Sequence, residues 1–262
     1  MLVLIKGAGD MASGAALRIY RAGFDVAMTD MEKPTAIRRT VCFSEAIRLG
    51  QTHVEDVLAK RAYDAKEARR LMSKRIIPVI ADEDCSIKNE LLPDVIVDAI
   101  LAKRNINTKI DDAGIVIALG PGFCAGRDCH AVIETQRGHN LGRVIRSGSA
   151  APNTGIPGII AGYGAERVLR APADGLFMPK KSIGDIVKAG DCVAEVSDEP
   201  MLAAISGVLR GLLPEGSSVH KGMKSGDIDP RGIREYCLTV SDKSMAVAGG
   251  VLEAILSLSR RL

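Results

Sequence analysis

The chain has 262 residues, of which 47% are hydrophobic and 26% charged, and its formal net charge at pH 7 is +3. This length and composition argue against disorder and predict a folded protein with two modest cores. The small net charge, the 3% aromatic content and the absence of Trp argue against nucleic acid as a partner.

The sequence predicts a cytoplasmic protein with no membrane segment. The N-terminus enters an apolar run at residues 2–5 without the features of a signal peptide. No run reaches the roughly 20 apolar residues that a bilayer span needs. The six cysteines are widely dispersed, which is typical of free thiols in a reducing compartment.

In chain order, apolar runs typical of strands alternate with helical segments over the first 119 residues. We expect strands at residues 2–5, 25–30, 76–81, 95–100 and 115–119. We expect helices from the glycine-rich turn to about residue 21 and at residues 44–49 and 64–73. This alternation predicts an α/β fold, with a Rossmann-like parallel sheet in a domain of residues 1–165. That domain includes a glycine-rich polar segment, residues 120–165.

A repeat with a constant offset of 32 residues follows. Its first copy contains Ala171, Gly175, Gly184, Val187 and Gly190, which recur as Ala203, Gly207, Gly216, Val219 and Gly222. The repeat predicts a duplicated all-β domain at residues 166–240, similar to the barrel-sandwich fold of biotinyl and lipoyl carrier domains. The predicted hairpin tip, residues 196–201, lacks the lysine that carriers modify, which indicates a docking or oligomerisation module. Residues 241–262 are expected to pack back, with a helix at residues 244–260.

The first glycine-rich turn lies between a predicted strand and a predicted helix. In this context, glycines let a phosphate approach the helix N-terminus, and an acid that closes the second strand can bind ribose hydroxyls. The predicted cofactor-binding residues are Gly7, Gly9, Asp10, Met11, Gly14 and Asp30. The alternative is a purely structural turn that binds no nucleotide.

The segment after residue 119 concentrates ionisable residues at the end of a predicted strand, where α/β sheets collect ligands. The predicted anion-binding residues are Gly120, Gly122, Arg127, His130, Glu134, Arg137, His139 and Arg143. For the charged residues, the alternative is a solvated face or interdomain salt bridges. For His130, the alternative is a hydrogen bond to Glu134. Cys124, Cys129 and His130 lack a second ligand pair, so we expect no metal.

Five phrases together resemble the YqeB-type accessory proteins of the selenium-dependent molybdenum hydroxylase system. These phrases occupy residues 5–14, 39–46, 120–123 together with 130–139, 152–157 and 226–231. The type is distantly similar to xanthine dehydrogenase accessory proteins. The resemblance implies a role in maturing molybdenum hydroxylases, with the hydroxylase or its maturation proteins as partners.

Three functions remain open from the sequence. The first is a maturation factor that binds a small anionic ligand, with a dinucleotide or the molybdenum cofactor as the candidates. The second is an NAD(P)-binding oxidoreductase with His130 or His139 as proton relay. The third is a non-enzymatic assembly protein with an empty nucleotide fold. No catalytic residue is assigned, and a homo-oligomer is compatible with each.

Overall fold

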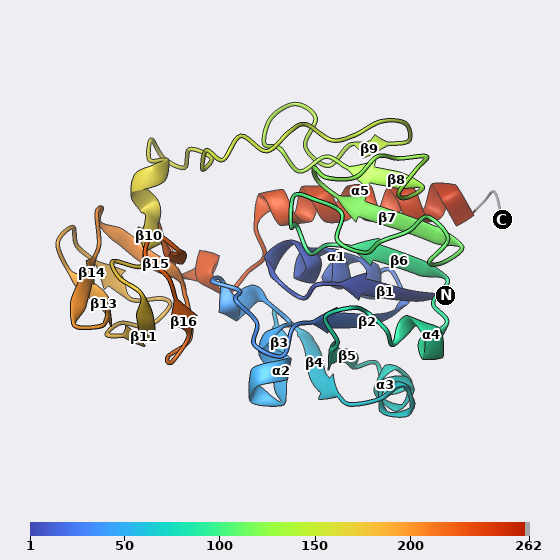
Figure 1. The fold of residues 1–262 in the computed structure, drawn as a ribbon, viewed down its shortest axis with the longest axis horizontal. Helices are drawn as coiled ribbons and strands as arrows, with labels where there is room; N and C mark the ends of the chain where they lie inside the picture. Colours follow the sequence, from blue (N-terminus) through green and yellow to red (C-terminus); the bar gives the residue numbers. More distant parts are fainter. Residues whose placement is uncertain (260–262) are drawn as a thin grey trace. The chain divides into compact units, whose positions relative to one another are not determined.

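The computed structural model describes residues 1–259, which form two compact units (Figure 1). Unit 1 contains residues 1–34, residues 42–154 and the chain from Val240. Unit 2 contains residues 35–41 and 155–239. Residues 35–41 and 155–165, which the sequence boundaries place in the first domain, thus belong to unit 2.

Unit 1 is built on a nine-stranded sheet with the order β3-β4-β5-β2-β1-β6-β7-β8-β9. The strands are β1 (Leu2–Lys6), β2 (Asp25–Asp30), β3 (Gln51–Val54), β4 (Val57–Ala62), β5 (Ile77–Ala81), β6 (Val95–Asp98), β7 (Ile115–Leu119), β8 (Ala131–Ile133) and β9 (Val144–Ile145). The central strands are almost entirely buried and mostly apolar, which is the pattern expected of strands covered on both faces.

The predicted Rossmann-like parallel sheet is wrong, because this sheet is mixed. Strands β3 and β4 pair antiparallel across a tight turn in which Glu55 adopts a φ of +54°. Strands β8 and β9 also pair antiparallel. Residues 99–114 and 120–130, which lead from β6 to β7 and from β7 to β8, contain no α-helix. These two connections therefore lack the helical crossovers of a regular Rossmann-like sheet.

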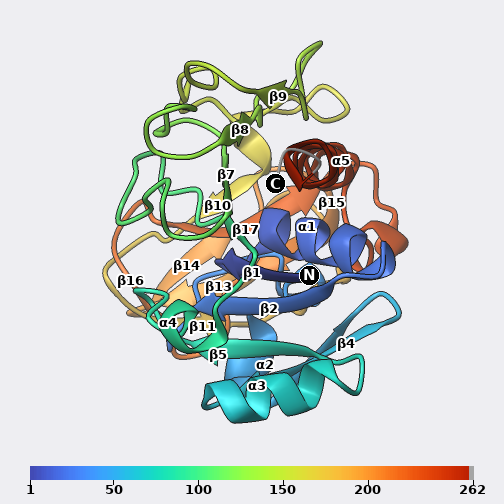
Figure 2. The same ribbon diagram turned by 90° about the vertical axis from the view of Figure 1, so that its right-hand side faces the viewer.

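The helices of unit 1 are α1 (Asp10–Arg21), α2 (Glu45–Leu49), α3 (Ala65–Met72), α4 (Lys88–Leu91) and α5 (Asp242–Ser259). Helices α1 and α5 lie side by side, as Figure 2 shows. In one hydrophobic cluster of unit 1, residues of α3 and α4 pack against Leu4, Ala27 and Ile96 of the sheet. Because side chains alternate along a strand, the neighbours of Leu4 in β1 point to the opposite face. The predicted helix end at Arg260 lies outside the described residues.

Unit 2 consists of two four-stranded antiparallel sheets, ordered β10-β17-β15-β12 and β14-β13-β11-β16. The strands are β10 (Val168–Arg170), β11 (Gly175–Pro179), β12 (Ile186–Val187), β13 (Cys192–Val196), β14 (Glu199–Leu202), β15 (Gly207–Leu212), β16 (Ser218–Val219) and β17 (Lys224–Asp229). Three 3-10 helices also belong to unit 2, η1 (Arg39–Val41), η2 (Ala165–Arg167) and η3 (Arg234–Cys237).

The 32-residue repeat corresponds to equivalent hydrogen bonds in the two halves of unit 2. Gly184 N donates to Leu209 O at 2.8 Å, and Gly216 N donates to Phe177 O at 2.9 Å. The predicted barrel-sandwich fold is nevertheless wrong. The two sheets are open, and each has a two-residue strand, β12 or β16, at one edge.

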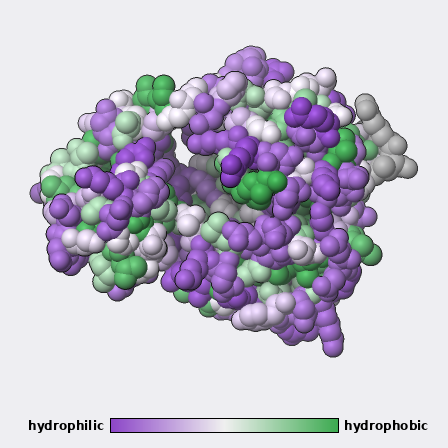
Figure 3. Space-filling model, in the orientation of Figure 1, coloured by the Kyte–Doolittle hydropathy of each residue, from purple (hydrophilic) through white to green (hydrophobic). Residues whose placement is uncertain are grey.

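Within residues 1–259, no helix combines the length and the apolar character that crossing a membrane requires. Hydrophilic residues cover most of the face drawn in Figure 3.

Candidate functional site

The carboxyl ends of β1, β2, β6, β7 and β8 share one edge of the sheet in unit 1, because these strands are parallel. Polar residues close or follow several of them, including Lys6, Asp30, Asp98 and Glu134. In sheets of this kind, ligands bind at the carboxyl ends of the strands, near the point where the strand order reverses. Strands β1 and β6 lie at that point, since the chain adds strands outward from β1 on both sides.

The glycine-rich turn after β1 is tied to the end of β2. Gly7 has a φ of +92°, and its N–H donates to Thr29 O at 2.8 Å. Asp30 Oδ2 accepts a hydrogen bond from Ala8 N at 2.8 Å, and Asp30 Oδ1 accepts one from Met31 N at the same distance. Burial raises the pKa of the Asp30 carboxyl, although both N–H groups favour the carboxylate. The predicted strand-end acid therefore lies beside the turn, where it holds the turn's backbone.

The three glycines of the turn have different surroundings. A Cβ at Gly7 would lie 3.1 Å from Ala99 O, and one at Gly14 would overlap Ser244 Oγ. Gly9 caps the N-terminus of α1 in an extended conformation, with a φ of −74°. A Cβ at Gly9 would have no atom within 4 Å beyond its chain neighbours and its own helix. Of the three, Gly9 alone faces open space.

The N-terminal turns of α1 and α5 meet at this edge. Ser244 Oγ donates to Asp10 O at 3.1 Å, and Ser244 also covers Gly14. The predicted site residue Met11 is buried, with 8% exposure. The two helices run parallel, because Gly249 in turn lies next to Arg18. Both helix dipoles therefore present their positive ends at the same place.

Lys243 lies in the first turn of α5 and is half-buried. Burial lowers the pKa of this amine, and the positive charge of Arg137 lowers it further. The carboxylates of Asp10, Glu134 and Asp242 act in the opposite sense without reversing the shift. Sequence reasoning missed Lys243, since only the return of α5 to the sheet brings it near Glu134.

A second lysine at this edge, Lys6, belongs to a buried network of hydrogen bonds and an ion pair. Lys6 Nζ lies 3.4 Å from Asp98 Oδ2, and both side chains are almost completely buried. Lys6 also donates to Asn107 Oδ1 at 2.5 Å, while Thr108 Oγ1 donates to Asp98 Oδ2 at 2.6 Å. The network ties the segment after β6 to the end of β1. Asp98 could have been found from its position at a strand end.

The glycines and two charged residues after β7 have local partners. Gly120 and Gly122 have φ values of +75° and +106°. A Cβ at Gly120 would collide with Thr135, and one at Gly122 would collide with the backbone of Arg104. Arg127 is exposed and pairs with Asp128 at 3.0 Å. His130 Nδ1 accepts a hydrogen bond from Val116 N at 3.0 Å. The alternative in which His130 bonds to Glu134 is not observed, because His130 bonds to β7 instead.

The other predicted anion-binding residues form separate contacts. Glu134 is buried, and its carboxylate accepts hydrogen bonds from Gln136 N at 2.7 Å and Ala151 N at 2.8 Å. Arg137 binds Asp242 through two hydrogen bonds, at 2.8 and 3.0 Å. The exposed His139 lies 3.4 Å from Arg143 Nη2. Arg137 and Glu134 thus lie near Lys243, whereas Arg127 pairs within its own loop. A single anion site that includes the four predicted cations remains a prediction. These are Arg127, Arg137, His139 and Arg143.

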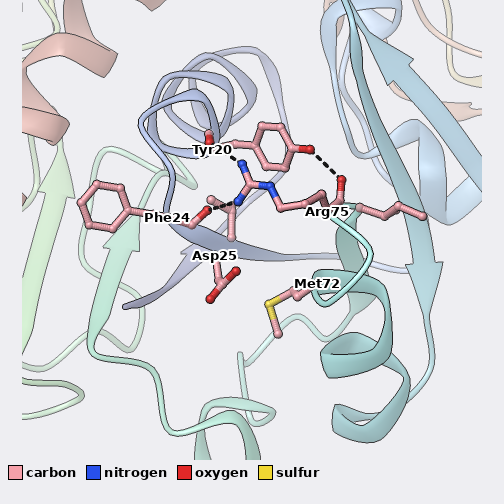
Figure 4. A pocket seen from close by; sticks show the side chains of 7 residues that line it. Tyr20, Phe24, Asp25, Met72 and Arg75 are labelled. Atoms are coloured by element: carbon pink, nitrogen blue, oxygen red, sulfur yellow. Dashed lines mark hydrogen bonds between the residues drawn. The ribbon is translucent and has the colours of Figure 1, made fainter.

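A small pocket lies at the opposite end of β2 (Figure 4). Arg75 donates to Tyr20 O at 2.9 Å and to Phe24 O at 3.3 Å, and Tyr20 OH donates to Arg75 O. Asp25, the first residue of β2, also lines it. No predicted site residue lies there. Among the described residues, no group of three or more His, Cys, Asp or Glu side chains could hold a metal ion.

No known family model matches the chain. Solved structures with partial similarity include an aspartoacylase family protein from Mesorhizobium loti, with a TM-score of 0.28 and 9% identity. The match covers 87% of this chain and 83% of that one. A succinylglutamate desuccinylase/aspartoacylase from Rhodobacter sphaeroides has a TM-score of 0.26 and 15% identity, over 87% and 84% of the two chains. TM-scores this low establish neither a shared fold nor a shared activity.

One curated relative is far more similar. Over 257 residues, which make up 98% of this chain, the sequence is 52% identical to the uncharacterized protein YqeB of Escherichia coli K12. The match covers 48% of that relative, so the chain spans about half of its length. Nearly the whole chain is therefore similar to about half of a YqeB-type protein.

Proposed function

We propose that this chain is a cytoplasmic accessory factor in the maturation of selenium-dependent molybdenum hydroxylases. In this role, unit 1 binds a phosphate-bearing ligand, either a nucleotide or the molybdenum cofactor, at Gly9. The similarity to YqeB supports the type of protein, and the geometry at the head of α1 supports the class of ligand. The partners are then a molybdenum hydroxylase or its other maturation proteins.

The open space beside Gly9 is the observation that carries this proposal. Packing explains why Gly7 and Gly14 lack side chains, since Ala99 and Ser244 occupy the space. Packing gives no such reason at Gly9, where the backbone conformation also allows any residue. Close approach of a ligand to the backbone does give a reason.

The chemistry of the turn fits a phosphate group. The first N–H groups of α1, which belong to Asp10, Met11 and Ala12, have no acceptor within their own helix. Together with the helix dipole, they favour a negative charge beside Gly9. Asp30 can accept a further hydrogen bond from a ligand hydroxyl, because each carboxylate oxygen has two lone pairs. The molybdenum cofactor carries such a phosphate, and a nucleotide carries both groups.

Gly9→Asn tests the site. Asn is a favourable N-cap residue, so the variant should fold as well as the wild type, and its side chain would fill the open space. We expect molybdopterin or a nucleotide at 100 times its Kd to stabilise the wild type by about 2.7 kcal/mol, measured by thermal unfolding. The stabilisation should be lost in Gly9→Asn and retained in the control Gly249→Ala.

Each result has a definite meaning for function. Stabilisation by NAD or NADP alone would favour the oxidoreductase alternative. Stabilisation by no ligand would favour an assembly protein that binds no nucleotide. Equal stabilisation of the wild type and Gly9→Asn would show that the ligand binds elsewhere.

The maturation role is tested in cells. A strain that carries Gly9→Asn should lose selenium-dependent molybdenum hydroxylase activity, while Gly249→Ala should keep it. Full hydroxylase activity in cells that lack the whole protein would contradict the role.

A further inference from the structure

The two sheets of unit 2 differ in the exposure of equivalent side chains. Because the repeat offset is 32 residues, Leu176 of β11 corresponds to Val208 of β15, and Met178 of β11 corresponds to Arg210. Val208 and Arg210 are buried. Leu176 and Met178 are 59% and 42% exposed. The same position of the repeat is therefore covered in one sheet and exposed in the other.

In the sheet that contains β15, the chain itself covers Arg210. The 3-10 helix η3 packs against β15, and Arg210 Nε donates to Tyr236 O of η3 at 3.0 Å. Arg210 Nη1 also donates to Asp229 Oδ2 at 3.0 Å. The side chain that corresponds to Met178 is thus held by a segment of its own unit.

The exposed side chains of the other sheet lie on one face. Because side chains alternate along a strand, Leu176 and Met178 point away from the core in which Phe177 is buried. The next residue in this alternation, after the end of β11, is Lys180. In register, Met178 lies beside Glu195 of β13, and Glu195 lies beside Pro200 of β14. We call this surface the open face, and it consists of Leu176, Met178, Lys180, Glu195, Pro200 and Leu202.

The open face combines apolar side chains with one base and one acid. Exposed apolar side chains that lie together mark a surface for binding another protein. Lys180 Nζ lies 2.7 Å from Glu195 Oε2, and both side chains are exposed. A face with one positive and one negative charge side by side is complementary to itself. A twofold axis between the two charges places each Lys180 opposite the Glu195 of the other copy.

The edges of this sheet are less suited to association than its face. Strand β14 forms one edge, and Pro200 in this strand has no N–H to donate to a further strand. Strand β16 forms the other edge and is only two residues long. A short edge strand and a proline both limit the addition of strands from another chain. These features favour face-to-face packing.

We propose that two copies of this chain associate through the open face to form a twofold-symmetric dimer. Leu176, Met178 and Leu202 supply the apolar contacts. The ion pair of Lys180 and Glu195 extends across the interface into a network of four charges. This association is separate from ligand binding at Gly9, which belongs to unit 1.

Charge reversal tests the interface. Lys180→Glu gives the open face two acids, and Glu195→Lys gives it two bases, so copies of each variant should repel one another. A mixture of the two variants should form a heterodimer, because faces of opposite charge then meet. Sedimentation velocity at micromolar concentrations should give the mass of two chains for the wild type and for the mixture. Each variant alone should give the mass of one chain.

A matched pair of substitutions tests the apolar contacts. Leu202 on the open face and Ile186 of β12, in the other sheet, are both 52% exposed. Leu202→Asp should raise the Kd of the dimer at least about tenfold, because the interface would bury a charge without a partner. Ile186→Asp should leave the Kd unchanged, and circular dichroism shows whether each variant is folded.

Two results would overturn the proposal. The first is a wild type with the mass of one chain at every concentration. The second is a dimer that persists in both Lys180→Glu and Leu202→Asp, because the interface would then lie elsewhere on the chain.

Discussion

Both units pair some buried charges, as Lys6 and Asp98 do in unit 1, but the two units differ in how other buried ionisable groups are held. In unit 2, buried acids are paired with arginines: Asp229 contacts Arg210 at 3.0 Å and Arg231 at 2.6 Å, and Asp227 contacts Arg167 at 2.5 Å. In unit 1, Asp30 is held by backbone N–H groups, and Lys243 has carboxylates only at longer range. Ion pairs hold the buried acids of unit 2 in place. The second set, Asp30 and Lys243, is held without ion pairs, and it lies at the carboxyl edge of unit 1, where we propose the ligand site.

Asp229→Ala should have the largest effect, because it breaks a buried pair. The side chains of Asp229 and Arg210 are 1% and 7% exposed. Removing one partner leaves the other charge buried without compensation, at a cost of about 3–5 kcal/mol. Urea unfolding followed by circular dichroism measures this loss. The exposed pair of Lys180 and Glu195 is the matched control, and Lys180→Ala should leave the free energy of unfolding nearly unchanged.

The pH dependence of this pair has a definite sign. Burial favours the neutral acid, but hydrogen bonds from Arg231 and the charge of Arg210 outweigh burial and lower the pKa of Asp229. The pair's contribution to stability is therefore present above about pH 3.8, and it is lost as the pH falls through the lower folded pKa. Stability of Asp229→Ala equal to that of the wild type at pH 7 would contradict the structural role given to unit 2.

Gly14→Ala should have an intermediate effect in unit 1. The new Cβ would overlap Ser244 Oγ and approach Ser244 Cβ at 3.0 Å. Overpacking costs about 1–3 kcal/mol, against a gain of about 1 kcal/mol from helix propensity. Gly249→Ala has the same gain, with only an ordinary contact to Arg18 at 3.7 Å. Thermal unfolding should rank Gly249→Ala above Gly14→Ala, and Ser244→Ala should recover part of the difference.

The sequence predicted most elements of unit 1 but not their assembly. Apolar runs identified β1, β2 and β7, the glycine-rich turn located α1, and amphipathic spacing identified α5. The hairpin of β3 and β4 was missed, because its short strands mix polar and apolar residues. The fold class was wrong because strand direction at the edges and helix-free connections depend on tertiary packing. In unit 2, the repeat predicted equivalent halves. Its spacing did not determine whether the two sheets would close into a barrel.

The candidate site was predictable only where it follows a single strand or turn. Gly9 and Asp30 follow from a strand, a turn and a helix in order along the chain. Lys243 follows from no local pattern, since it reaches the site through a helix more than 100 residues after Glu134. His130 was paired with the wrong group, because alternation along a strand does not predict a bond back to β7.

Lys243→Met should have the smallest effect on the free energy of unfolding. The sign of that effect distinguishes a buried charge that disfavours folding from one that an ion pair stabilises. Burial lowers the folded pKa of Lys243 below 10.5, so the unfolded chain binds the proton more tightly. The charge thus disfavours folding at all pH values below the folded pKa, and stability rises with pH from there towards 10.5. Lys243→Met should be as stable as the wild type at pH 7, or more so, and should lack this rise. Urea midpoints between pH 7 and 10.5 measure the difference, with the exposed Lys66→Met as control. A wild type that loses stability relative to Lys243→Met as the pH rises would mean that a carboxylate holds the amine, as in the ion pairs of unit 2.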